Sequence, residues 1–208
     1  MRGLYLVTDR ELCRGRPLTQ IVRQAVEGGV AYVQLREKGL SFRDFVDEAL
    51  EIKKLLETCR VPLIINDRVD VALACGAAGV HLGQSDMPYS EARKIMGAKT
   101  IIGLSVETWP DVEEAERFDV NYIAVSPVFT TPTKTDTKEP WGLEGLKKIK
   151  KFSRHTLVAI GGVNEKNISA VVTAGADCVA VVSAICAADD PFLATRSLKD
   201  LIDSAVFP

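Results

Sequence analysis

Four short polar clusters follow short apolar runs in this sequence, and their side chains could together bind a multiply charged anion and a divalent metal ion. The clusters occupy residues 34–38, 66–67, 81–86 and 130–134. Each preceding apolar run is typical of a buried parallel strand. Because parallel α/β proteins carry their chemistry at the carboxyl ends of the strands, we expect the clusters to converge. Cations beside carboxylates indicate a diphosphate held together with magnesium.

The first cluster supplies the cations Arg36 and Lys38. Arg36 offers a planar fork for phosphate oxygens, and Lys38 offers a compact point charge. Strand alternation places Gln34 and Arg36 on the same side as the chain leaves the sheet. A solvated surface loop is the alternative for Arg36, Glu37 and Lys38. Gln34 interrupts an apolar strand, and because a buried amide needs hydrogen-bond partners, its position favours a place in the site.

The second and third clusters supply Asn66, Asp67 and Asp86. Magnesium prefers oxygen ligands, keeps several waters and is commonly held by one or two carboxylates plus substrate phosphates. Helix capping is the alternative, since Asp67 precedes a helical stretch and Asp86 precedes Pro88. The two aspartates occupy the same place after consecutive strands, which favours a shared metal site.

The elements that must position these clusters alternate regularly along the chain. Strand-like runs occupy 3–7, 32–35, 63–65, 79–82, 101–104, 122–125, 157–160 and 178–182, and helical patterns occupy 18–27, 42–59, 69–75, 89–96, 111–117, 143–152, 167–174 and 191–204. Ser41, with Asp44 three residues later, is close to a capping box at one helix start. The pattern predicts an α/β fold, a single-domain (βα)8 TIM barrel over residues 1–208. A flavodoxin-like open sheet is the alternative, but it would need fewer strands.

Small residues after the last two strands predict a second, uncharged anion site. Gly161 and Gly162 follow the seventh strand, Val182 ends the eighth, and Ser183 comes directly after it. Many (βα)8 enzymes hold a phosphate here through backbone amides. Glycine allows close approach, and a side chain at Gly162 is expected to intrude on the phosphate oxygens. A plain turn is the alternative for the two glycines. A barrel holding both anion sites should join two phosphorylated molecules and release pyrophosphate.

Composition restricts the partners and the compartment. The 208 residues are 47% apolar with a formal charge of −2, which gives no overall attraction to nucleic acid or anionic membranes. No apolar stretch approaches the roughly 20 residues that span a bilayer. The amino-terminal residues meet a charged turn too soon for a signal peptide. We therefore expect a cytoplasmic protein that binds small phosphorylated molecules, with no nucleic-acid or membrane partner.

The cysteines and histidines exclude several classes of site. The five cysteines are scattered without metal-type spacing, and their odd number argues against a disulfide framework. Core packing is expected for Cys75 and Cys178. His81 lies within the fourth strand, where a hydrogen-bonded packing role is favoured over catalysis, and His155 begins the seventh strand at the inert end. Without a well-placed histidine, a Ser/His/Asp hydrolase has little support.

The connection 126–141 is long and rich in Thr, Pro and Lys. Long loops without regular structure inside compact domains are often ligand loops or lids. We expect this one to close over the substrate and to bring Lys134 to the diphosphate.

These motifs together resemble the thiamine-phosphate synthase (thiamin phosphate pyrophosphorylase) family. The resemblance runs essentially from Tyr5 to Ile185, with QLREK at 34–38, ND at 66–67, HLGQSD at 81–86, GLS at 103–105, TPTK at 131–134, GG at 161–162 and VSAI at 182–185. It implies joining of 4-amino-5-hydroxymethyl-2-methylpyrimidine diphosphate to a thiazole phosphate, which gives thiamine phosphate and pyrophosphate. Relatives in this family are commonly small homo-oligomers, and the resemblance leaves the oligomeric state of this chain open.

The resemblance further implies a role for each site residue. Mg²⁺ would be bound by Asp67 and Asp86. The charge of the diphosphate would be neutralised by Arg36, Lys38, Asn66 and Lys134. The pyrimidine or its diphosphate would be contacted by Gln34 and Ser105. Thr131, Thr133, Gly162, Val182 and Ser183 would hold the thiazole phosphate. Carbon–oxygen cleavage can precede carbon–nitrogen bonding because the aminopyrimidine stabilises a benzylic-type cation. The protein then needs no strong base, and its task is charge stabilisation and positioning, with Arg36, Lys38, Ser105 and Lys134 as the catalytic groups.

Two positions depart from the family pattern, and two other functions compete. Glu107 stands where relatives often carry a histidine or a small polar residue, and Thr130 replaces a frequent proline. A thiazole tautomerase on the same barrel would carry a histidine in the loop after strand six, where this chain has Ser126, Pro127, Val128 and Phe129. A non-catalytic regulator would not need two carboxylates and three cations together. The preferred form of the thiazole phosphate stays open.

Overall fold

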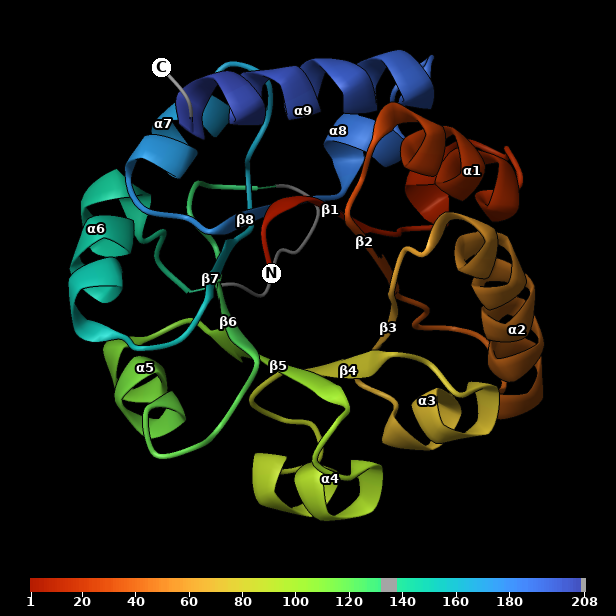
Figure 1. The fold of residues 1–208 in the computed structure, drawn as a ribbon, viewed down its shortest axis with the longest axis horizontal. Helices are drawn as coiled ribbons and strands as arrows, with labels where there is room; N and C mark the ends of the chain where they lie inside the picture. The colour runs from red at the N-terminus through yellow and green to blue at the C-terminus, as the bar shows by residue number, and fades with distance from the viewer. Residues whose placement is uncertain (132–137, 207–208) are drawn as a thin grey trace.

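The computed structural model describes residues 1–131 and 138–206, and its eight strands form a closed parallel barrel in sequence order (Figure 1). The strands are β1 (Gly3–Val7), β2 (Tyr32–Leu35), β3 (Leu63–Asn66), β4 (Gly79–Leu82), β5 (Ile101–Val106), β6 (Tyr122–Val125), β7 (Leu157–Ala159) and β8 (Cys178–Val181). The predicted single-domain (βα)8 barrel is confirmed. Strands β3 and β5 extend beyond their predicted ends, so Asn66 and Ser105 belong to strands and are held by the sheet.

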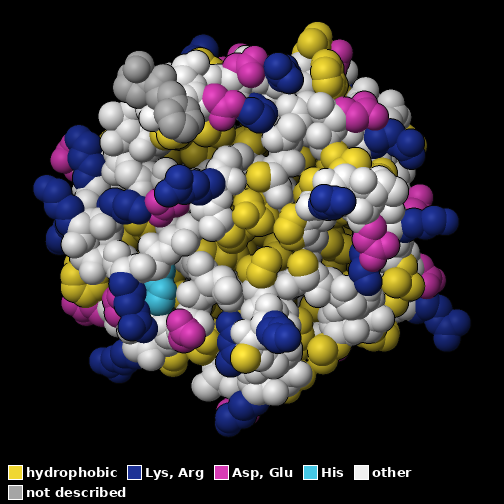
Figure 2. All heavy atoms as spheres, viewed as in Figure 1, with side chains coloured by type: hydrophobic (Ala, Val, Ile, Leu, Met, Phe, Trp, Pro, Cys, Tyr) yellow, Lys and Arg dark blue, Asp and Glu magenta, His cyan; other side chains and the backbone are white. Residues whose placement is uncertain are grey.

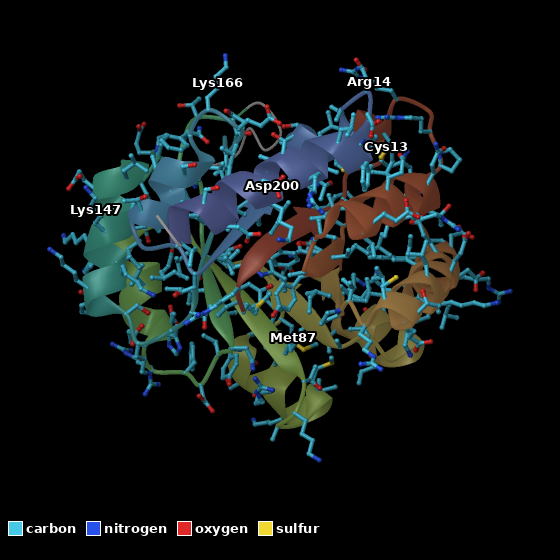
Figure 3. The ribbon with its side chains drawn as sticks, turned by 45° about the horizontal axis from the view of Figure 1, so that its top comes forward. Cys13, Arg14, Met87, Lys147, Lys166 and Asp200 are labelled. Atoms are coloured by element: carbon cyan, nitrogen blue, oxygen red, sulfur yellow. The ribbon has the colours of Figure 1, made fainter. Side chains whose placement is uncertain are left out.

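Helices surround the barrel on its outside (Figure 1). They are α1 (Leu18–Gly28), α2 (Phe42–Cys59), α3 (Val69–Cys75), α4 (Tyr89–Met96), α5 (Trp109–Ala115), α6 (Gly142–Phe152), α7 (Ile168–Thr173), α8 (Ser183–Cys186) and α9 (Pro191–Val206), with a 3₁₀ turn η1 at Glu11–Cys13. Helix α9 packs against α1 and α7 and closes the ring. Lys147 on α6 and Lys166 before α7 extend outward, away from the barrel (Figure 3).

The prediction for α5 is wrong by two residues at its start. Thr108 and Asp111 form a reciprocal capping box, in which the Thr108 hydroxyl accepts from the Asp111 backbone and the Asp111 carboxylate accepts from the Thr108 backbone. Pro110 lies in the first turn, where a missing N–H costs nothing. These local hydrogen bonds start the helix before its apolar pattern becomes visible.

Two apolar layers hold the barrel together. The larger layer lies between the strands and the helices. The smaller layer fills the barrel interior, with Tyr5, Ile64, Tyr122 and Val158 among its members. At the end of the barrel where the chain's amino terminus lies, apolar side chains occupy the centre and charged side chains lie around the rim (Figure 2). The interior is therefore packed near that end, and open space remains toward the carboxyl ends of the strands.

The five cysteines are free thiols, and Cys59 is exposed. Cys75 and Cys178 are buried, as expected of packing residues. Burial raises the pKa of the Cys178 thiol to about 12, which keeps it protonated and unreactive. Within residues 1–131 and 138–206, no helix is long and apolar enough to cross a membrane.

Candidate active site

A cavity of about 350 Å³ opens at the carboxyl ends of the strands. It brings together the predicted site residues that the structure describes, which are Gln34, Arg36, Lys38, Asn66, Asp67, Asp86, Ser105, Thr131, Gly162, Val182 and Ser183. Clusters that lie far apart in the chain therefore share one space. Thr133 and Lys134 lie outside the described residues, and so does the central part of the expected lid.

Arg36 and Lys38 leave β2 on the charged side of the cavity, and each already contacts a carboxylate. The Arg36 guanidinium lies 3.3 Å from Asp9, and the Arg36 backbone N–H donates to the Thr8 hydroxyl. The Lys38 ammonium lies 2.5 Å from the Asp67 carboxylate. Each cation thus has a carboxylate partner at the cavity, and the Lys38 side chain is 59% exposed.

Asp67 and Asp86 do not cap helices, so that alternative is wrong for both. Helix α3 begins after Arg68 and helix α4 after Pro88, and neither start has a side-chain cap. Asp67 instead adopts a left-handed backbone conformation with φ of +63°, and its N–H donates to the His81 carbonyl. The Asp86 carboxylate accepts from the Gly83 N–H at 2.6 Å. Neither carboxylate therefore caps a helix, and both residues line the cavity.

The two carboxylates lie close enough to influence one another. Burial acts to raise the pKa of Asp67, but the Lys38 ammonium and a hydrogen bond shared with Asp86 hold it below its usual value. Burial and the neighbouring Asp67 carboxylate raise the pKa of Asp86. Two like charges brought together in this way attract a cation.

The oxygen atoms of Asp67 and Asp86 are ligands of the kind that magnesium prefers. Among the described residues no group of three or more His, Cys, Asp or Glu side chains gathers at one point. Magnesium does not need such a cage, because it binds through one or two carboxylates and fills its remaining positions with water and substrate phosphates. Asp67 and Asp86 are two carboxylates that could serve in this way.

The opposite side of the cavity is lined by glycines and other uncharged residues. Gly161 and Gly162 have positive φ values of +100° and +67°, and the Gly162 carbonyl accepts from the Asn167 side chain. A Cβ at Gly162 would lie 2.8 Å from the Phe129 Cβ and from the Thr130 carbonyl oxygen. A side chain at Gly162 would therefore meet the β6–α6 connection, and the expectation that it would also intrude on phosphate oxygens stays a prediction.

Helix α8 carries Ser183 at its start, and the sequence pattern missed this helix. Its carboxyl end is held by Arg16, whose guanidinium donates to the carbonyls of Cys186 at 2.8 Å and Ala188 at 2.6 Å. Arg16 thereby satisfies carbonyls that a helix end leaves without partners. A helix of four residues shows no periodicity, and Arg16 is distant in the chain, so no local signal predicts either feature.

Polar groups also lie at the base of the cavity. The Gln34 side chain is only 4% exposed and donates to the Tyr5 hydroxyl at 2.9 Å, which confirms that the buried amide has a partner. His81 is buried and hydrogen-bonded as predicted, to Tyr122 and Ser105, and it also lines the cavity. His155 bonds the Ala115 carbonyl and is not among the residues that line the cavity. Tyr5 and Tyr122 were missed because nothing in the local sequence distinguishes them from packing residues.

Comparison with known proteins agrees with the motifs. The family model described as thiamine monophosphate synthase matches residues 4–185. The chain belongs to this family. The thiamine-phosphate synthase of Albidiferax ferrireducens is 55% identical over 97% of this chain and 92% of its own, and that of Vibrio parahaemolyticus is 51% identical over 96% and 98%.

Solved structures agree with both fold and family. A thiamine phosphate pyrophosphorylase from Pyrococcus furiosus superimposes with a TM-score of 0.90 at 36% identity, covering 98% of this chain and 96% of the other. A 3-hexulose-6-phosphate synthase from Salmonella typhimurium has a TM-score of 0.75 at 19% identity, which shows a shared fold alone. The protein is thus a thiamine-phosphate synthase family enzyme, a transferase of thiamine biosynthesis.

Proposed function

We propose that the enzyme joins 4-amino-5-hydroxymethyl-2-methylpyrimidine diphosphate to a thiazole phosphate and releases pyrophosphate, assisted by Mg²⁺. The observation that carries this proposal is that two cations and two carboxylates share one cavity with two glycines and other uncharged residues. The first group of residues suits a diphosphate with a metal, and the second suits a phosphate monoester. Two differently built anion sites in one space fit a reaction between two phosphorylated molecules.

The charged side would act on the bond that breaks. As the methylene carbon–oxygen bond cleaves, the electron pair moves to the departing pyrophosphate, and Arg36, Lys38 and Asn66 stabilise that charge. Mg²⁺ held by Asp67 and Asp86 would supply further charge neutralisation. Lys134 is proposed for the same task on sequence grounds. Pre-placed cations contribute most where charge develops in the transition state.

The uncharged side would place the nucleophile. Gly162, Val182 and Ser183, with Thr131 and Thr133, would hold the thiazole phosphate so that the thiazole nitrogen faces the methylene carbon. The nitrogen lone pair then forms the new carbon–nitrogen bond without losing a proton, so no general base is required. Positioning of this kind accounts for much of the rate enhancement in reactions between two bound molecules.

A pyrophosphate-release assay tests the proposal. The protein is mixed with both substrates and Mg²⁺, and each component is then omitted in turn. We expect pyrophosphate only when all three are present, in equal amount to thiamine phosphate. Conversion of the thiazole phosphate alone would indicate the tautomerase, and binding without turnover would indicate a regulator. A cytoplasmic location, a homo-oligomer and the absence of nucleic-acid or membrane partners stay predictions.

A further inference from the structure

A chain of hydrogen bonds crosses the barrel beneath the cavity and connects four strands to β5. The Gln34 amide nitrogen donates to the Tyr5 hydroxyl at 2.9 Å, and the Tyr5 and Tyr122 hydroxyls lie 3.1 Å apart. The Tyr122 hydroxyl lies 3.0 Å from Nδ1 of His81, and Nε2 of His81 lies 2.9 Å from the Ser105 hydroxyl. Each link has hydrogen-bond geometry, so the groups form one continuous path from Gln34 to Ser105.

The barrel is shaped to hold this path. A Cβ at Gly103 would lie 2.0 Å from Cζ of Tyr122, so only glycine at that position lets the tyrosine ring cross the barrel. The His81 and Tyr122 rings stack with centroids 5.6 Å apart and an interplanar angle of 17°. Tyr5 and Tyr122 are 1% and 0% exposed. Packing therefore fixes the rings, and the hydrogen bonds that their hydroxyls make in the structure all lie along the path.

Counting protons along the path gives it a direction. The Gln34 nitrogen can only donate, so the Tyr5 oxygen accepts from it and the Tyr5 proton is left for Tyr122. The Tyr122 proton then goes to Nδ1 of His81, which must be the bare nitrogen. Nε2 of His81 consequently carries the proton and donates it to the Ser105 oxygen. In the opposite direction, with Gln34 still donating, the Tyr5 proton would be buried without a partner, which costs free energy.

We propose that His81 is a positioning residue, held as the neutral Nε2–H tautomer by this one-way path, and that it turns the Ser105 hydroxyl into a hydrogen-bond donor toward the bound pyrimidine diphosphate. Ser105 lines the cavity, and its oxygen is already an acceptor from His81. Its own proton is therefore directed at an acceptor on the substrate, a ring nitrogen or a phosphate oxygen. Burial raises the pKa of both tyrosines, which keeps the hydroxyl protons on which the path depends.

The tautomer can be read directly in the substrate-free protein. The chain has two histidines, so a His155→Gln variant leaves His81 as the only imidazole in a long-range ¹H–¹⁵N correlation spectrum. We expect a protonated Nε2 and a bare Nδ1. In the Tyr122→Phe variant, Nδ1 loses its donor and the two tautomers should mix. A proton on Nδ1 in the otherwise unaltered path, or on both nitrogens, would overturn the proposal, since it would require the Gln34 amide to present its oxygen to Tyr5.

The consequence for the reaction is tested by a double-mutant cycle. This kinetic test rests on the proposed function, whereas the NMR spectrum of His81 does not. The spectrum can contradict the proposed tautomer even if pyrophosphate is released, and it can support the tautomer even if no pyrophosphate is released. Tyr122→Phe should lower kcat/KM for the pyrimidine diphosphate roughly 3- to 10-fold, the effect of one hydrogen bond. It should leave KM for the thiazole phosphate unchanged. In a Ser105→Ala background the same change should have almost no further effect.

Matched controls separate positioning from simple packing. Tyr32→Phe removes another tyrosine hydroxyl, beside Tyr5 but outside the path, and should leave kcat/KM unchanged. His81→Gln keeps an N–H in reach of Ser105 and should retain more activity than His81→Leu. Full additivity of Tyr122→Phe with Ser105→Ala, or equal losses for His81→Gln and His81→Leu, would show that these residues only fill the barrel.

Discussion

The two sides of the cavity mouth offer an anion different kinds of group. On the side of β2, β3 and β4, charged groups dominate, and the Arg36–Asp9 and Lys38–Asp67 pairs hold opposite charges together before any ligand arrives. On the side of β7 and β8, Gly161 and Gly162 adopt positive φ values. Among the residues that the structure describes, those that line the cavity from β7, β8 and the segments directly after them carry no charge. The charged side suits a group whose charge grows during reaction. The uncharged side suits a phosphate that only anchors its molecule.

The difference also concerns what each side can tolerate. Charged side chains at the mouth can be exchanged for uncharged ones of similar shape with little effect on packing, so their loss should appear in the chemistry. The glycines are packed against the β6–α6 connection, so their substitution should appear in stability. Variants on the two sides are therefore expected to fail in different ways.

The largest effect is expected for the two aspartates of the charged side. Asp67→Asn and Asp86→Asn keep the side-chain shape, and asparagine tolerates the left-handed conformation of Asp67 better than alanine would. Losing one metal-binding carboxylate should lower kcat on the order of 10³-fold, or about 4 kcal/mol of transition-state stabilisation. Turnover is measured across a magnesium titration.

The matched control is Asp70→Asn, which alters a carboxylate on α3 that pairs with Arg68 and lies outside the cavity lining. It should retain normal turnover and folding. Near-normal activity of both Asp67→Asn and Asp86→Asn at limiting magnesium would show that these two aspartates do not bind the metal ion.

The uncharged side is tested through stability by Gly162→Ala against Gly142→Ala. Both glycines have positive φ, but a Cβ at Gly142 meets nothing within 4 Å, whereas one at Gly162 meets Phe129 and Thr130 at 2.8 Å. The left-handed conformation alone should cost about 1–2 kcal/mol in each variant. Crowding should add about 1–3 kcal/mol for Gly162→Ala only. Urea unfolding measures the free energy of unfolding of both variants. Equal losses of stability would mean that close contact with Phe129 and Thr130 is not the reason for a glycine at position 162.

Next in size is the loss of the arginine at the charged side. Arg36→Ala removes a charge-assisted hydrogen bond contributing roughly 1.5–3 kcal/mol, so KM for the pyrimidine diphosphate should rise about 10- to 150-fold. KM for the thiazole phosphate should stay unchanged. Arg196→Ala, on the outer helix α9, is the control because it also removes an arginine from an ion pair. An equal rise in both Michaelis constants would erase the distinction between the two sides.

The strands and the charged side were largely predictable from the sequence. Buried parallel strands are short apolar runs, and polar residues at their ends are conspicuous, so Arg36 and Asp67 were identified and lie at the cavity. Ser41 was also predicted correctly as a helix start, and its hydroxyl accepts from the Asp44 N–H. These signals are local, since each involves residues within a few positions of one another.

What could not be predicted depends on contacts between distant segments. The Tyr5 and Tyr122 hydroxyls meet across the barrel, 117 positions apart. The crowding at Gly162 comes from Phe129 and Thr130, and the clamp on α8 comes from Arg16. A sequence window contains only one partner of each contact. On the uncharged side, the sequence predicted residues that line the cavity, but it did not show which distant segments they pack against.

The smallest effect is expected for Ser183→Ala. Ser183 begins α8 on the uncharged side, and its hydroxyl is one of several groups proposed to hold the thiazole phosphate, beside backbone N–H groups that the substitution leaves intact. One neutral hydrogen bond contributes about 0.5–1.5 kcal/mol, so KM for the thiazole phosphate should rise only about 2- to 12-fold. Ser169→Ala on α7, whose hydroxyl bonds the Leu201 carbonyl away from the cavity, is the control. Steady-state kinetics with each substrate varied in turn give the result. The contrary result would be that Ser183→Ala raises KM for the thiazole phosphate as much as Arg36→Ala raises KM for the pyrimidine diphosphate. That result would mean that the uncharged side, like the charged side, depends strongly on a single side chain.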